Sequence, residues 1–524
     1  MSQMKMRQID MRIRKAATRL LPMFVATVAL LWTVTAHAAV PGLQGPSFSL
    51  TAQANYITQP DGAAIYSWGY GCASGSNPKF VPFAGLCPTM QVPGPTLIVT
   101  EGQTVTVTLA NNLPAAAGNT SILFPGFKVT TNGGVQGLLT QEAAPAGSVT
   151  YTFQATSPGT HPYYSGTQPD LQVEMGLYGA VVVLPNTNQA GCTALGNELG
   201  GRTDYRLAPS AYDHPTTCYD REYMFQFAEL DPRIHRQAEA QISAIASCVP
   251  TSTSTCPTRL DVVTEPYHPA YYLINGRSMP DDMDPAYAPN YPNQPYNGNP
   301  HMHPGELILL RVIGQGRWQH PFHEHANHVR ILARDGNLLL SPTDPTKLGG
   351  RLEFTTDTTP GQAFDGIFYF SGRGLNWDMY GHKAGDGSVC IPDANGYYTA
   401  ASGAPANASN YYEWCQDHDK ALETNPIGNV ATGGPATLPD PMIVTNGLWY
   451  SGTPYLGPDA RLRAVGNTPL PPGGALQNPP GESGWAFMWH SHNEREITTN
   501  DVFPGGMLMM MLVDPPVFVI DETL

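Results

Sequence analysis

The stretch VPGPTLIVTEGQTVTVTLANNL, residues 92–113, carries the clearest strand pattern in the chain. Within it, Val105, Val107 and Leu109 alternate with threonines, as a strand with one buried face requires. Two further stretches predict strands, GELILLRVIG at residues 305–314 and GGMLMMMLVD at residues 505–514. Because the first and last of these stretches lie far apart in the chain, the sequence predicts an all-β architecture throughout.

The composition also favours short strands joined by turns. The 524 residues include 53 Gly and 50 Pro, which are scattered rather than periodic. Glycine and proline in such numbers are typical of turns and long loops, so we expect few long helices. The length without the N-terminal segment, about 486 residues, has room for two or three domains.

The N-terminus has the pattern of a secretory signal. Six Lys and Arg residues precede an apolar run at residues 20–34, and Ala36-His37-Ala38 closes the run as a small-x-small cleavage site. We therefore predict a signal peptide at 1–38, a periplasmic or extracellular mature chain, and no membrane span after signal cleavage. An uncleaved membrane anchor is the alternative.

The charge of the chain limits its partners. Removal of the six basic residues and one Asp of the signal moves the formal net charge from −15 to −20. Such an acidic chain argues against nucleic acid and anionic lipid as partners, and it mildly favours cations. The sequence indicates no particular protein partner and no oligomeric state.

All eight cysteines follow the predicted cleavage site. In an oxidising compartment an even number of cysteines favours disulfides over thiolate metal ligands. Many connectivities are open, and the sequence spacing suggests four couples of neighbours. These couples are Cys72 with Cys87, Cys192 with Cys218, Cys248 with Cys256, and Cys390 with Cys415.

Four stretches resemble, in the expected order, motifs of the multicopper oxidase family, which includes the laccases. Residues 92–113 resemble the opening of the first cupredoxin domain, and SPGTHPYYSGTQPDLQVEMGLYGAVVV (157–183) resembles its close. YYLINGRSMPD (271–281) with GELILLRVIGQGRWQHPFHEHANHVRILARDG (305–336) resembles a later His-Pro-Phe-His-x-His series. GWAFMWHSH (484–492), followed by GGM, resembles the closing His-Cys-His and Gly-Met. The resemblance implies tandem cupredoxin-like Greek-key β-sandwich domains.

The copper ligands of the family are only partly present. The first-domain ligand positions hold other residues, namely Leu123, Pro125, Tyr164 and Gly166. Ser491 stands at the cysteine of the type 1 copper, and Glu496 aligns with the histidine five residues later. A hydroxyl that stays protonated near neutral pH does not replace the thiolate that blue copper requires. The resemblance therefore implies a divergent member without laccase-type four-electron chemistry.

The matching histidines form the candidate metal site. Residues i and i+2 of a strand point to one face, so His323 with His325, and His490 with His492, form two like-facing pairs. If the two strands are neighbours, as the family fold implies, four imidazoles converge and suit copper or another divalent transition metal. The other interpretation is an empty, hydrogen-bonded remnant of an oxidase site.

Other side chains are weaker candidates. His320 and His328 are additional candidate ligands, for which we favour structural and packing roles. For four further groups of side chains we expect neither metal binding nor catalysis. These groups are His301 with His303; Met507, Met509, Met510 and Met511; Asp417, His418 and Asp419 beside Cys415; and Glu494 with Glu496. We expect the extra histidines and aspartates in solvated loops, the methionines as core filler, and the glutamates exposed or paired with Arg495.

Motif order predicts the domains. We expect a first cupredoxin-like domain at 46–188, a connecting segment at 189–260, and a second cupredoxin-like domain at 261–524 with a long insertion at about 379–480. A third divergent domain from about 385 is the alternative.

The predicted function is metal binding by an exported multicopper-oxidase-like protein. Copper, in fewer than four ions, is the expected cofactor, and another divalent transition metal is the alternative. A mononuclear four-histidine site leaves room for oxidoreductase activity on a small-molecule or metal-ion substrate, if the metal keeps an open coordination position. The alternative is a non-enzymatic binding or structural protein on a cupredoxin scaffold.

Overall fold

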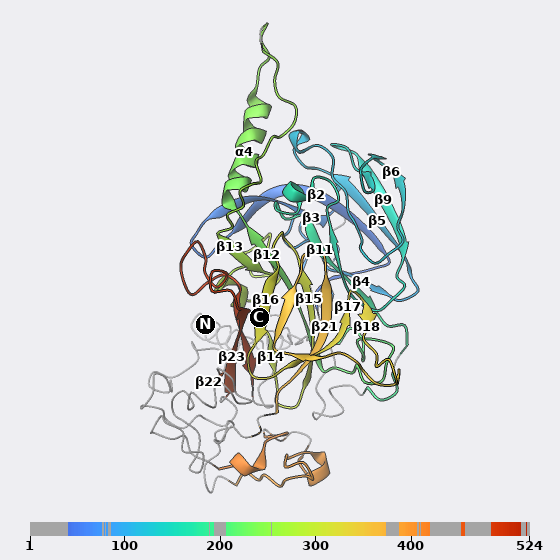
Figure 1. Cartoon of the computed structure of the whole chain (residues 1–524), viewed down its shortest axis with the longest axis vertical. Coiled ribbons are helices and arrows are strands. Elements are labelled where there is room, and N and C mark those ends of the chain that lie inside the picture. The colour runs from blue at the N-terminus through green and yellow to red at the C-terminus, as the bar shows by residue number, and fades with distance from the viewer. Residues whose placement is uncertain are drawn as a thin grey trace, which may run out of the picture. The chain divides into compact units, whose positions relative to one another are not determined.

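The computed structural model of the chain describes residues 40–75, 78, 80–81, 85–187, 189–192, 206–252, 254–371, 373, 387–405, 408, 410–419, 452–455, 484–514 and 520 (Figure 1). The predicted signal peptide at 1–38 and much of the predicted insertion lie outside these residues. Strands dominate the described part of the chain, and helices are few. The predicted all-β class is therefore confirmed.

The first β-sandwich consists of two sheets. One sheet has the order β1 (Leu43–Gln44), β4 (Leu97–Thr100), β11 (Tyr178–Leu184), β10 (Gly159–Tyr164). The other has the order β3 (Ala64–Cys72), β2 (Ser47–Thr58), β5 (Thr104–Asn111), β9 (Ser148–Gln154), β6 (Thr130–Gly133). Val105, Val107 and Leu109 of β5 are fully buried in the core between the sheets, as their alternation predicted.

The second β-sandwich also consists of two sheets. One has the order β13 (Tyr271–Ile274), β12 (Arg221–Leu230), β15 (Leu307–Gly314), β21 (Ala363–Tyr369), β17 (Val329–Arg334), β18 (Asn337–Leu338), with β19 (Leu352–Glu353) paired to β17. The other has the order β14 (His301–Met302), β24 (Leu508–Val513), β23 (Gly484–Ser491), β16 (His320–Glu324), β20 (Thr355–Thr358), with β22 (Gly452–Tyr455) paired to β23. The predicted strands at 305–314 and 505–514 are thus β15 and β24.

Aromatic side chains and methionines join the two sheets of this second sandwich. Phe225 of one sheet meets Phe322 and Trp489 of the other, with ring centroids 6.0 Å and 6.4 Å apart. Met507, Met509 and Met511 are fully buried in the same core. These three methionines are therefore core filler, as expected, whereas Met510 is half-buried.

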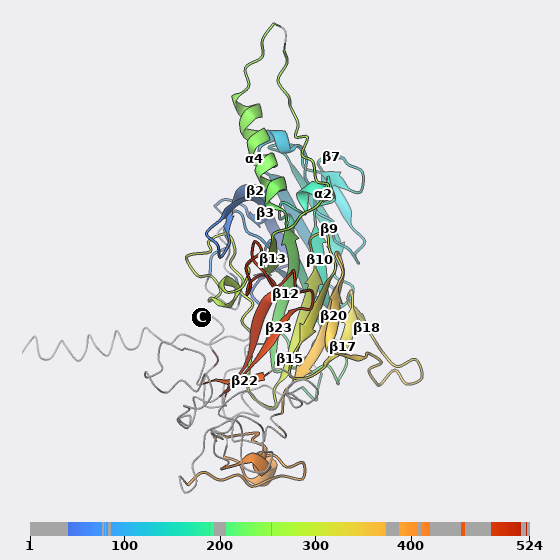
Figure 2. The same cartoon turned by 60° about the vertical axis from the view of Figure 1, so that its left-hand side comes forward.

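The predicted connection at 189–260 contains regular structure. Its strand β12 pairs with β13 and β15, and thus belongs to a sheet of the second sandwich. The helix α4 (Pro232–Ser247) follows, with Asp231 as its N-cap accepting a hydrogen bond from the Arg233 N–H. In both views α4 extends beyond the strands (Figure 2).

Four disulfides join the couples that the sequence spacing favours: Cys72–Cys87, Cys192–Cys218, Cys248–Cys256 and Cys390–Cys415. Structural disulfides are typical of chains that fold in oxidising compartments, which places this protein outside the cytoplasm. No helix among the described residues combines the length and the apolar character needed to cross a bilayer.

A buried polar network connects the two sandwiches. Arg311 of β15 pairs with Glu222 of β12 at 2.8 Å and faces Asp365 of β21 at 3.7 Å. Asp365 in turn accepts hydrogen bonds from the backbone N–H of Thr160 in β10, at 3.0 Å, and from the hydroxyl of Tyr212. All of these side chains are almost completely buried. The network therefore ties β10 of the first sandwich to β15 and β21 of the second.

Removal of Asp365 should weaken this junction. The Asp365→Ala variant leaves buried donors on Arg311, Thr160 and Tyr212 without their acceptor, so we expect a loss of about 3–5 kcal/mol in unfolding free energy. Chemical denaturation measures this loss. The exposed carboxylate of Asp344, paired with Lys347 on the surface, provides the control, and Asp344→Ala should leave the midpoint unchanged. Equal midpoints for the two variants would contradict the role assigned to Asp365.

Candidate metal centre

The pairing of β16 with β23 determines where the candidate ligands point. In this antiparallel pair, His323 lies opposite His490, and Phe322 lies opposite Ser491. Directly opposite residues project to the same face of a sheet, and successive residues alternate between faces. The imidazoles of His323 and His490 therefore share one face. Ser491 lies on the other face, as the sequence predicts.

Three histidines converge on that face. The ligand nitrogens of His323, His325 and His490 all lie within 4.8 Å of one another, and the three residues are buried. The Nε2 atoms of His325 and His490 are 3.2 Å apart. The ring of His492 lies 4.8 Å from that of His323 and 5.6 Å from that of His490, but its side chain is 49% exposed. The arrangement is thus three buried imidazoles with a fourth at the solvent side.

Hydrogen bonds orient two of these rings. The Nδ1–H of His490 donates to the backbone carbonyl of Ser491 at 2.7 Å, and a carbonyl only accepts. The lone pair of neutral His490 therefore lies on Nε2, the atom that faces His325. Nδ1 of His323 lies 2.7 Å from the hydroxyl of Thr355 in β20. Such contacts fix the ring and the tautomer of a metal-binding histidine.

The electrostatics of the cluster favour neutral imidazoles. Burial, and then repulsion from His490 and His492, lower the pKa of His323 to about 4. Burial also lowers the pKa of His490. Neutral imidazole is the form that binds a metal ion, so these two ligands need no deprotonation near neutral pH. Three convergent imidazoles fit Cu(II), Zn(II) or Ni(II), and three protein ligands with an open position are typical of catalytic metal sites.

His320 lies on the opposite face of β16, in a second polar cluster. Its Nε2 is 2.9 Å from Glu229 of β12, and its Nδ1 is 2.9 Å from Glu496. Glu496 also accepts a hydrogen bond from the hydroxyl of Ser491. All four side chains are buried. Both ring nitrogens of His320 are therefore engaged by carboxylates of the protein.

The environment of Glu496 differs from the sequence prediction. We expected an exposed side chain or a pair with Arg495, and this was wrong: Glu496 is 1% exposed and contacts His320, while Arg495 pairs with Asp501. The turn that follows β23 brings Glu496 to the same face of the sheet as His320. Its partner therefore depends on tertiary packing and not on the local sequence. The contribution of Glu229 was missed entirely, because it lies in the segment interpreted as a connection.

The remaining histidine candidates lie outside the cluster. His328 is exposed, with its ring edge-on to Phe354 at 5.0 Å. His301 and His303 were expected in a solvated loop, and this was wrong because both are buried. Nδ1 of His301 lies 2.7 Å from Asp514, and Nδ1 of His303 lies 2.7 Å from Glu306. These carboxylates satisfy the two imidazoles inside the protein.

The first-domain positions provide no histidine. Leu123 and Tyr164 form a backbone bridge, in which the Leu123 N–H donates to the Tyr164 carbonyl at 2.8 Å. Gly166 lies directly against Leu123, because a side chain there would meet Leu123 at 2.8 Å. Apolar and backbone contacts therefore occupy this part of the first sandwich.

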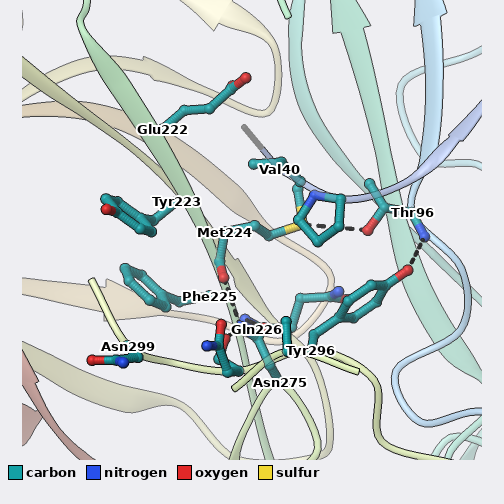
Figure 3. A pocket seen from close by; sticks show the side chains of 13 residues that line it. Val40, Thr96, Glu222, Tyr223, Met224, Phe225, Gln226, Asn275, Tyr296 and Asn299 are labelled. Carbon is teal, nitrogen blue, oxygen red and sulfur yellow. Dashed lines mark hydrogen bonds between the residues drawn. The ribbon is translucent and has the colours of Figure 1, made fainter. Parts of the chain in front are cut away.

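A small pocket between β12 and the loop at 293–299 is a poor substrate site. Gln226, Asn275 and Asn299 line it, together with Tyr296, whose hydroxyl accepts a hydrogen bond from the Thr96 N–H (Figure 3). Its volume of about 40 Å³ has room for only a few water molecules. The histidine cluster, with His492 at the solvent side, is the better candidate for chemistry.

Comparison with known proteins shows a resemblance over part of the chain. Residues 87–188 match the family described as multicopper oxidase. The chain is 34% identical over 102 residues to Laccase abr2 of Aspergillus fumigatus and 35% identical over 101 residues to Multicopper oxidase MCE of Talaromyces pinophilus. Each match covers 19% of this chain and 16% of the relative. Over residues 87–188 the chain thus resembles the multicopper oxidases, and its described strands form cupredoxin-like β-sandwiches.

A solved structure is similar over a longer part of the chain. The blue copper oxidase from Nitrosomonas europaea aligns with 89% of this chain and 85% of its own, at 15% identity and a TM-score of 0.44. The sequence matches, by contrast, are confined to about a sixth of the length of the curated relatives. The family match at residues 87–188 lies in the first sandwich, where Leu123, Pro125, Tyr164 and Gly166 provide no histidine.

The ion pairs of His320 predict a pH-dependent stability. Burial alone would lower the pKa of His320, but the hydrogen bonds to Glu229 and Glu496 raise it from the ordinary 6.5 to about 9. Because the folded-state pKa is the higher one, the stabilisation is complete below about pH 6.5 and is lost as the pH rises through about 9. We expect a loss of roughly 3 kcal/mol, measured by chemical denaturation at about pH 6 and about pH 10.

Two variants test this assignment. Glu496→Gln removes one carboxylate from His320 and should reduce the pH-dependent loss of unfolding free energy. Glu494→Gln changes a side chain in the same turn that is 85% exposed, and it should behave like the wild type. An equal loss in all three proteins would show that His320 is not the group that titrates.

Proposed function

We propose that this protein is an exported metal-binding protein with one copper site at His323, His325 and His490, completed by His492 from the solvent side. The convergence of three buried ligand nitrogens within 4.8 Å carries the proposal. The family match makes copper the first choice among the metals that imidazoles bind. Another divalent transition metal is the alternative cofactor.

The proposed chemistry differs from that of a laccase. Ser491 and Glu496 replace the type 1 ligands, and Leu123, Pro125 and Tyr164 stand at first-domain ligand positions. Electron entry through a blue copper and four-electron reduction of oxygen at a trinuclear cluster are therefore excluded from the proposal. The site proposed here is mononuclear.

The residues of the proposed site have different roles. Copper, when bound, supplies a redox centre and a Lewis acid. The hydrogen bond from His490 to the Ser491 carbonyl fixes one ligand, and the contact of His323 with Thr355 fixes another. His492 lies on the exposed side, so a small-molecule or metal-ion substrate approaches from there and delivers its electrons directly.

A non-enzymatic role is the second candidate. A cupredoxin-like scaffold with a long insertion also suits a binding or structural protein, in which the histidine cluster remains as an internal hydrogen-bonded group. We propose the domain division 46–188 and 261–524 for both candidates, and β12 of the intervening segment 189–260 adds a strand to the second domain. A periplasmic or extracellular location suits both, and fractionation of cells that produce the full chain distinguishes the two compartments.

Metal analysis tests the copper site. The protein, purified from a periplasm without added metal, should contain about one copper per chain and lack the intense thiolate–copper absorption of blue copper proteins. His323→Ala with His490→Ala should remove the copper, because two of the three buried ligands are lost.

Single variants provide the controls for this measurement. His328→Ala changes an exposed histidine outside the cluster and should leave the copper content unchanged. His492→Ala should weaken binding without abolishing it. A wild-type protein free of transition metal would favour the scaffold role, and copper retained by the double variant would rule out the proposed ligands.

A further inference from the structure

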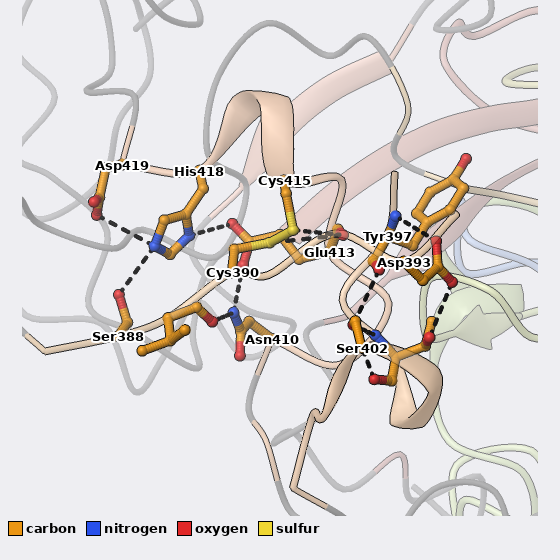
Figure 4. Close-up of a disulfide and its surroundings, with 12 residues drawn as sticks. Ser388, Cys390, Asp393, Tyr397, Ser402, Asn410, Glu413, Cys415, His418 and Asp419 are labelled. Atoms are coloured by element: carbon orange, nitrogen blue, oxygen red, sulfur yellow. Dashed lines mark hydrogen bonds and ion pairs between the residues drawn. A yellow bond between two sulfur atoms is a disulfide. The ribbon is translucent and has the colours of Figure 1, made fainter. Parts of the chain in front are cut away.

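The described part of the insertion contains a second cluster of metal-binding side chains. The Cys390–Cys415 disulfide lies beside Glu413 and His418 (Figure 4). Ligand atoms of Cys390, Glu413 and His418 are all within 4.8 Å of one another. Nδ1 of His418 is 2.9 Å from Glu413, whose second carboxylate oxygen accepts a hydrogen bond from the Asn410 side chain at 2.6 Å. We expected a solvated loop here, but the Glu413 side chain is only 4% exposed and that of His418 only 13%.

We propose that the Cys390–Cys415 disulfide masks a metal site, which opens on reduction and takes a soft divalent cation of the Zn(II) type. Two thiolates, one imidazole and one carboxylate then form a four-ligand set. Sulfur, nitrogen and oxygen ligands of this kind are typical of tetrahedral zinc sites. This site is separate from the copper site of the second sandwich and does not depend on it.

The opening step is a thiol–disulfide exchange. An external dithiol attacks the Cys390–Cys415 bond through a mixed disulfide. The dithiol ends as a disulfide, and its two electrons and two protons convert the two cysteines to thiols. Metal binding then displaces both thiol protons to solvent, because only the thiolates bind the metal. In the oxidised protein the sulfurs carry no charge and are poor ligands.

The surroundings hold the ligands in place without the disulfide. The Tyr398 N–H donates to the Glu413 carbonyl at 2.9 Å. The neighbouring Tyr412 stacks on Tyr397 with ring centroids 4.6 Å apart. A side chain at Gly305, in the turn before β15, would meet the ring of Tyr412 at 2.5 Å, so this ring packs against the second sandwich. Reduction therefore removes the S–S bond but not the contacts that position Glu413.

In the part of the chain that the structure describes, no such group of neighbours surrounds the other three disulfides. Among the described residues, Cys390 is the only cysteine in a group of three potential ligands that includes a histidine and a carboxylate. Cys72 and Cys87 are 2% and 5% exposed, so a reductant has poor access to them. Cys390 and Cys415 are half-buried, and a small dithiol can reach them.

A thiol variant tests the site without any reductant. In a His323→Ala, His490→Ala background, which removes the copper ligands, Cys415→Ala leaves the Cys390 thiol beside Glu413 and His418. With Cd²⁺ as the probe, we expect one bound ion per chain and a thiolate-to-metal charge-transfer band. Adding Cys390→Ala to this variant should abolish both signals. Because neither protein has the disulfide, the difference between them reports on the Cys390 thiol alone.

Three further proteins in the same background complete the test. Adding His418→Ala to the Cys415→Ala variant should weaken Cd²⁺ binding about tenfold or more. Cys218→Ala leaves a free thiol at Cys192, outside any such group among the described residues, and should bind no ion tightly. The protein with all cysteines present should bind one more Cd²⁺ per chain after treatment with a dithiol. The Cys390→Ala, Cys415→Ala protein should show no such increase after the same treatment. No gain of Cd²⁺ in the Cys415→Ala variant, or an equal gain in Cys218→Ala, would overturn the proposal.

Discussion

The antiparallel pairing of β16 with β23 is the contact on which both polar clusters of the second sandwich depend. Its register places His323 opposite His490, and the neighbouring pair places Phe322 opposite Ser491. Side chains alternate across a sheet, so a shift of one residue in either strand would turn the imidazoles into the core and the core residues outward. The aromatic contacts of Phe322 and Trp489 on the inner face oppose such a shift. Core packing thus fixes the geometry of the candidate metal centre.

The inner face of this strand pair carries a buried polar cluster around His320. Glu229 and Glu496 flank His320, and Ser491 donates to Glu496. Buried charges are tolerated only when they are paired and hydrogen-bonded. Here an imidazole between two carboxylates connects β12, β16 and the turn after β23. The two faces of this strand pair therefore differ: one carries the ion-paired His320 within the core, and the other carries the three converging histidines of the candidate metal centre.

The sequence predicted features that follow from local alternation. The strand at Val105, Val107 and Leu109 and the orientation of Ser491 away from His490 follow from a period of two that can be read directly from the residues. That the strands of His323 and His490 are neighbours was expected only from the family resemblance. Partners that meet through tertiary packing were not predictable in this way. Glu229 and Glu496 approach His320 from distant segments, and His301 and His303 find carboxylates in Asp514 and Glu306. His492 lies just after the end of β23 and is half-exposed, which its spacing from His490 alone did not predict.

The two halves of the histidine cluster are far apart along the chain, and the insertion lies between them. His325 and His490 meet because their strands are hydrogen-bonded neighbours, and no short connection holds them together. The entropy of closing a flexible loop grows slowly, by only about 0.6 kcal/mol for each doubling of its length. A change in the length of the chain between the two strands should therefore cost the histidine cluster little free energy, provided that β16 and β23 still pair.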